Sequence, residues 1–82
     1  MKATVITNEQ FLDLVGWTIE GEQIGHYEVY HLDHPEIKMM YAYVLNGKVR
    51  YARALDTKDW NEAKSYVREV LKQDYADMLH LC

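Results

Sequence analysis

The residues of this chain that could do metal chemistry are the histidines and the one cysteine. His31 and His34 flank Asp33 in a short segment, and His80 and Cys82 stand at the end of the sequence. Imidazole, carboxylate and thiolate groups all bind zinc, but structural zinc sites combine them as paired ligands at short, repeated spacings. One cluster and a terminal cysteine do not form such a set. We therefore expect loop and surface histidines, no metal site and no cofactor.

Catalytic motifs are also missing. The sequence contains no glycine-rich phosphate loop, no nucleophile elbow and no cysteine–histidine pair at a motif spacing. Glu20 and Glu22 are close in sequence, but they lie at a predicted turn, Gly21-Glu22, where both carboxylates would be solvated. A chain of 82 residues also has little volume for a substrate pocket. These observations predict a protein that is not an enzyme.

Composition and charge favour binding. Seven tyrosines, two tryptophans and four methionines are many for 82 residues, and these residue types are enriched at protein interfaces. The net charge of −4 is uneven: one basic and seven acidic residues precede Ile37, and eight basic and six acidic residues occupy the rest. One interpretation is ordinary solubility. The other is an acidic surface for a protein partner with a basic surface, formed by Glu20, Glu22, Glu28, Asp33 and Glu36.

A predicted hairpin over residues 37–55 organises the remaining candidates. Asn46-Gly47 separates two apolar runs, and this dipeptide favours a type I′ turn because both central residues need a positive φ. A two-residue loop then predicts three cross-strand pairs on one face, namely Val44–Val49, Ala42–Tyr51 and Met40–Arg53. The opposite face would carry Tyr41, Tyr43 and Leu45, with Arg50 opposite Tyr43.

Two helices and a first hairpin complete the predicted α+β domain. Thr7 and Gln10 have the spacing of a capping box, which predicts a helix over 8–15 that ends with Gly16 in the left-handed conformation. Residues 1–7 form a short strand or an arm, and Gly21-Glu22 turns a hairpin between 18–20 and 24–32. Asp56 is the predicted N-cap of a helix over 57–78, with Leu55 and Trp60 as a hydrophobic staple.

These elements predict a single domain over residues 1–82. It would have a short N-terminal helix, a three- to four-stranded antiparallel sheet and a long C-terminal helix packed on one sheet face. Leu55 belongs to the hairpin face of Val49, so we expect the long helix to cover that face. The face of Tyr41 and Tyr43 would then remain open, and we expect it to contact a partner protein or a second copy of the chain.

Several short segments resemble the double-stranded-RNA-binding domain, namely Tyr27-Glu28-Val29, His34-Pro35, Asn46-Gly47-Lys48-Val49 and Glu62-Ala63-Lys64. The resemblance implies a helix–strands–helix order. In that family a lysine-rich start of the last helix grips phosphates. Here residues 58–64 hold two lysines and two acids, and the whole domain is acidic. We therefore carry over the topology and no RNA site.

The expected function is non-catalytic protein binding. Small acidic chains of this kind look like inhibitors of nucleic-acid-acting proteins, such as immunity proteins, antitoxins or phage-encoded blockers of host defence nucleases. The alternatives are a divergent RNA-binding domain and a homodimer with no inhibitor role. No apolar run has the length of a membrane span, the N-terminus does not resemble a signal peptide, and the one cysteine allows no internal disulfide. We expect a cytoplasmic protein without membrane contact or nucleic-acid binding.

Overall fold

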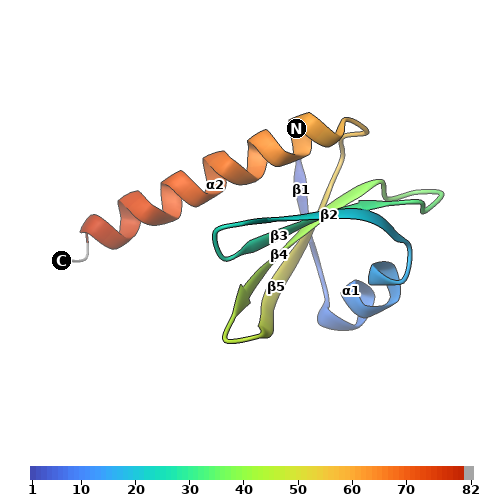
Figure 1. Cartoon of the computed structure of the whole chain (residues 1–82), viewed down its shortest axis with the longest axis horizontal. Helices are drawn as coiled ribbons and strands as arrows, with labels where there is room; N and C mark the ends of the chain where they lie inside the picture. Colours follow the sequence, from blue (N-terminus) through green and yellow to red (C-terminus); the bar gives the residue numbers. More distant parts are fainter. Residues whose placement is uncertain (81–82) are drawn as a thin grey trace.

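The computed structural model describes residues 1–80, and the side chains of residues 1–74. Its elements are β1 (Ala3–Ile6), α1 (Asn8–Val15), β2 (Thr18–Ile24), β3 (Tyr27–Leu32), β4 (Met39–Leu45), β5 (Lys48–Leu55) and α2 (Trp60–His80). The strands form one antiparallel sheet in the order β1-β5-β4-β3-β2 (Figure 1). The α+β class and the antiparallel sheet are confirmed. The sheet has five strands because residues 3–6, predicted as a short strand or an arm, pair with β5 as an edge strand.

The β4–β5 hairpin turns at the predicted residues but changes register beyond its first pairs. Asn46 and Gly47 have φ values of 53° and 75°, as a type I′ turn requires, and Val44 pairs with Val49. The next pair is Tyr43 with Tyr51, so Arg50 is the extra residue of a β-bulge. The predicted Ala42–Tyr51 and Met40–Arg53 pairs are therefore wrong. Because side chains alternate between faces, this one-residue shift moves Tyr51 to the face of Tyr43.

The sheet lies between the two helices, one on each face (Figure 1). The helix α1 covers one face with Phe11 and Leu14, against a core that includes Leu32, Met40 and Ala52. The helix α2 covers the other face, where the buried residues are Tyr27, Val29, Met39, Tyr41, Leu55, Ala63 and Val67. The prediction that Tyr41 and Tyr43 lie on an open face is wrong, because the bulge places them with Leu55 beneath α2.

The helix ends follow local side-chain chemistry. In the predicted capping box, Thr7 Oγ1 accepts from the Gln10 backbone N–H at 3.0 Å, and the Thr7 N–H donates to Gln10 Oε1 at 2.8 Å. Gly16 has a φ of −65°, so its predicted left-handed conformation is wrong. The chain continues from α1 into β2 through a right-handed turn, in which the Trp17 N–H donates to the Leu14 carbonyl.

The predicted start of the long helix is wrong by three residues. The helix α2 begins at Trp60, and Asp59 is its cap, since Asp59 Oδ1 accepts from the N–H groups of Asn61 and Glu62 at 2.9 and 3.2 Å. Asp56 has another role: its Oδ1 accepts from the Lys2 N–H at 2.8 Å, and its own N–H donates to the Lys2 carbonyl. Asp56 thus extends the β1–β5 pairing, and the helix cannot begin until that pairing ends.

The first hairpin also turns at a different place from the predicted one. Ile24 pairs with Tyr27, so Gly25 and His26 form the two-residue loop, and Gly25 has a φ of 62°. A positive φ at the first central residue alone is the pattern of a type II′ turn. Gly21, which we predicted in the turn, is an extended strand residue that pairs with Tyr30. A glycine in mid-strand leaves the sheet surface open at that point.

Candidate protein-binding surface

The two tyrosines predicted to bind a partner belong to a tyrosine cluster between the sheet and α2. Tyr41 is only 4% exposed, and its ring centre lies 5.7 Å from that of Tyr27 and 6.1 Å from that of Tyr66. Tyr43 is half-buried and stacks on Tyr51, with ring centres 5.5 Å apart and planes 5° apart. Burial raises the pKa of Tyr41 to about 12 and also raises the pKa of Tyr51. This cluster is part of the core.

A hydroxyl network ties the cluster to the helix. Tyr27 is fully buried, and its hydroxyl lies 3.0 Å from the Tyr51 hydroxyl. The same hydroxyl donates a hydrogen bond to the Asp74 carboxylate on α2. A buried tyrosine needs such partners because an unpaired hydroxyl in the core is costly. The network connects β3, β5 and the middle of α2, so the aromatic residues under α2 stabilise the fold.

The other two residues predicted on that face lie near its end. Leu45 is half-buried and pairs with Lys48 beside the Asn46-Gly47 turn. Arg50 is exposed in the bulge, and Arg53, not Arg50, lies over the Tyr51 ring at 4.4 Å. Of the predicted aromatic surface, therefore, only the edge around Leu45 and Arg50 and part of Tyr43 reach solvent.

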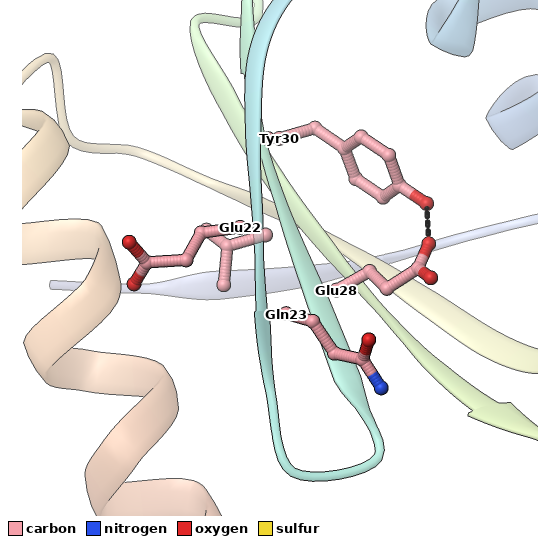
Figure 2. A pocket seen from close by; sticks show the side chains of 6 residues that line it. Glu22, Gln23, Glu28 and Tyr30 are labelled. Atoms are coloured by element: carbon pink, nitrogen blue, oxygen red, sulfur yellow. Dashed lines mark hydrogen bonds between the residues drawn. The ribbon is translucent and has the colours of Figure 1, made fainter.

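The predicted acidic residues divide between the two sheet faces and one loop. Glu20 and Glu22 of β2 lie on the α2 face, where Glu20 approaches His31 at 3.9 Å. Glu22 is 3.9 Å from Lys64 Nζ and 3.6 Å from Arg68 on α2. Glu22 therefore holds α2 on the edge strand and is partly neutralised by these bases. Figure 2 shows its side chain directed toward the helix.

Asp33 and Glu36 are exposed in the loop between β3 and β4. The loop is folded around His34, whose Nδ1 accepts from the backbone N–H groups of Glu36 and Ile37, both at 3.1 Å. The His34 ring also packs edge-on against Trp17, with ring centres 5.0 Å apart. No ion pair joins Asp33 or Glu36 to a base among the described side chains. Both carboxylates are therefore free to meet a partner.

Glu28 lies on the α1 side of the sheet, beside a shallow hollow of about 170 Å³. Gly21 forms its floor, and Gln23, Glu28 and Tyr30 point to the same side of the hairpin (Figure 2). The Tyr30 hydroxyl donates to the Glu28 carboxylate. Burial and this carboxylate raise the pKa of Tyr30 above its ordinary value. We did not predict this hollow because we placed Gly21 in a turn instead of a strand. With the turn at Gly25-His26, strand alternation puts residues 21, 23, 28 and 30 on one face of the sheet, and this alternation could have indicated the hollow.

The described residues offer little for other chemistries. Among them, no group of three histidine, cysteine, aspartate or glutamate residues could hold a metal ion. The His80 side chain and Cys82, the other potential metal ligands, lie outside the described part. No helix in the described range is both long and apolar enough to cross a membrane. Comparison of the chain with protein-family models, with curated proteins and with solved structures found no match.

Proposed function

We propose that this chain is a small acidic, non-catalytic protein-binding domain that inhibits a nucleic-acid-acting protein by occupying its basic surface. The observation that carries the proposal is the absence of lysine and arginine from residues 3–37, which contain seven acidic residues. This sector includes α1, β2 and β3, and the exposed acids of the β3–β4 loop lie in it. A surface of one sign attracts a partner of the opposite sign and speeds the encounter.

The geometry of the sector supports binding in preference to catalysis. Its exposed carboxylates Asp33 and Glu36 stand on a loop held by His34, and Glu28 borders a hollow with a glycine floor. A loop whose backbone is already held in place loses less conformational entropy when a partner binds it. The type of partner follows from charge: proteins that act on nucleic acids present basic surfaces to phosphates, and an acidic domain can compete for them. The likeness to phage anti-defence proteins, antitoxins and immunity proteins is an analogy of class, since all can be small acidic chains.

The alternative of RNA binding has weaker support. It requires the helix bases Lys64, Arg68 and Lys72 to be free for phosphates. Lys64 and Arg68 are engaged by Glu22, and Lys72 lies 3.5 Å from Glu69. Phosphate binding needs concentrated positive charge. A salt-dependent gel shift of duplex RNA at low micromolar protein would reverse this ranking.

A homodimer through the edge strand β2 is also disfavoured. Antiparallel pairing of β2 with a second copy about Gly21 would set Glu20 of each copy opposite Glu22 of the other. Like charges directly opposite in a sheet are destabilising. The register shift between Thr18 and Glu20 further interrupts the edge. We therefore favour a different protein as the partner, and sedimentation of the purified chain tests this preference.

The test uses the full chain as bait in a lysate of the source cell, with and without added nuclease. We expect a basic protein to be retained after nuclease treatment and released as salt rises. The double variant Asp33→Asn/Glu36→Gln should weaken retention. The matched variant Glu62→Gln/Glu69→Gln changes the charge equally on α2 and should leave retention unchanged. Retention that is insensitive to salt, or that both variants weaken alike, would contradict the proposal.

A further inference from the structure

The hollow over Gly21 presents hydrogen-bond acceptors to solvent. Its lining comprises Gly21, Glu22, Gln23, Glu28, Val29 and Tyr30, and none of these has a basic side chain. The Gln23 Nε2 donates to the Gly25 carbonyl at 3.2 Å, which leaves Oε1 as a free acceptor. The Tyr30 hydroxyl donates its hydrogen bond to the Glu28 carboxylate and so has no further proton to donate. The remaining capacity of the hollow is the Glu28 carboxylate, the Gln23 Oε1 and the Tyr30 ring.

We propose that this hollow binds the guanidinium group of an arginine side chain on the partner protein. The inference rests on the proposed function and names one contact within it. A guanidinium is planar and carries five N–H donors in a fixed fork, so it can donate to the Glu28 carboxylate and to Gln23 Oε1 together. The same plane stacks on a tyrosine ring, and the half-buried Tyr30 borders the site. Gly21 leaves the floor free of a side chain.

The electrostatic setting favours this occupant. No ion pair joins Glu28 to a lysine, arginine or histidine among the described side chains, whereas Glu22 on the opposite face is paired with Lys64 and Arg68. The Glu28 carboxylate is therefore available to an external base. Figure 2 shows Glu28, Gln23 and Tyr30 on the side away from α2, so the helix bases do not reach them. A charge-assisted hydrogen bond to Glu28 is stronger than a neutral one.

Two other cations match the hollow less well. The ammonium group of lysine is a compact, strongly hydrated charge that cannot span two acceptors with a fixed planar fork. A calcium ion requires six to eight oxygen ligands. The hollow supplies one carboxylate and one amide oxygen, and the described residues contain no group of three metal-ligating acids, histidines or cysteines. Arginine is the common cation whose shape uses both acceptors and the ring.

The test is an NMR titration of the full chain with N-acetyl-arginine amide. We expect saturable shifts of the Gly21, Glu28 and Tyr30 amide signals, with a several-fold weaker response to N-acetyl-lysine amide. N-acetyl-citrulline amide has the same shape without the charge and should bind roughly tenfold more weakly, as expected for loss of a charge-assisted bond. Equal responses to arginine and citrulline, or shifts that map elsewhere, would overturn the proposal.

Variants separate the parts of the site. Glu28→Gln should weaken arginine binding roughly tenfold by removing the charge. Tyr30→Phe keeps the ring and frees the Glu28 oxygen, so binding should be retained. Gly21→Val should abolish binding by filling the floor; Gly21 is an extended strand position, which suits valine, so this variant should fold. Glu62→Gln changes the same charge on the exposed face of α2 and should have no effect. Loss of binding in Glu62→Gln, or retention in both Glu28→Gln and Gly21→Val, would refute the assignment.

This experiment can fail separately from the proposed function. Saturable arginine binding in the hollow supports the contact even where the chain captures no basic protein from the lysate. Capture of a basic partner that Glu28→Gln and Gly21→Val do not weaken supports the proposed function and overturns this contact. Capture from the lysate therefore tests whether a basic partner exists, and the arginine titration with the variants tests whether that partner uses the hollow.

Discussion

Truncation of Tyr41 tests the position of α2 over the sheet. Tyr41 is 4% exposed and lies between Tyr27 of the sheet and Tyr66 of the helix. Truncating a buried aromatic side chain costs about 3–5 kcal/mol of the free energy of unfolding. A domain of this size has a total of about 4–12 kcal/mol, from roughly 0.05–0.15 kcal/mol per residue. Tyr41→Ala should therefore remove a large part of the stability of the chain.

Urea unfolding followed by the fluorescence of Trp17 and Trp60 and by circular dichroism measures this loss. Tyr41→Phe is the matched control for the ring, since the phenyl group keeps the packing, and it should cost much less than Tyr41→Ala because only the hydroxyl is removed. Leu12→Ala is the control for exposure, because Leu12 is 67% exposed on α1 and its truncation should stay within about 0.5 kcal/mol. A Tyr41→Ala variant that unfolds at the wild-type urea midpoint would refute the placement of α2 over this face.

Three further changes test the caps, the tyrosine cluster and the turns. Asp59→Ala should lower the free energy of unfolding by about 0.5–2 kcal/mol because it removes the cap of α2; thermal melts in which Asp56→Ala reduces helix content more would contradict this cap. At high pH, the raised pKa of Tyr41 means that the folded chain holds its proton where the unfolded chain, with a pKa near 10, releases it. This stability is present in full below about pH 10 and is lost toward about pH 12, at about 1.4 kcal/mol per pH unit, and Tyr41→Phe should flatten the loss in alkaline urea titrations. Gly25→Ala should destabilise more than Gly47→Ala, since both have a positive φ but only the new methyl at 25 would meet Leu71, at 3.1 Å; equal melting temperatures would argue against that contact.

The sequence by itself determined the features that depend on neighbours in the chain. The Asn46-Gly47 turn and the Val44–Val49 pair follow from the two positive φ angles that the turn requires. The capping box of Thr7 and Gln10 joins atoms three residues apart, so its spacing could be read directly. The α+β class followed from the order of apolar patterns. The turn and the capping box lie within a few residues, so their local conformation needs no distant partner.

Features that depend on distant contacts were decided by the tertiary structure. The bulge at Arg50 moves Tyr51 onto the face of Tyr43. The pattern of apolar and polar residues in β5 does not predict this bulge. Asp56 had good cap chemistry, but the backbone of Lys2, far away in sequence, binds its carboxylate and moves the cap to Asp59.

The candidate site followed the same division. The acids could be named from the sequence, but their sheet faces could not. Glu22 and Glu28 belong to one hairpin and point to opposite sides, and the turn at Gly25 decides which side each takes. A strand has a period of two, so an error of one residue in a turn or bulge exchanges the buried and exposed faces. Only the packing of both helices against the sheet fixes that choice, because it sets which face each side chain must bury.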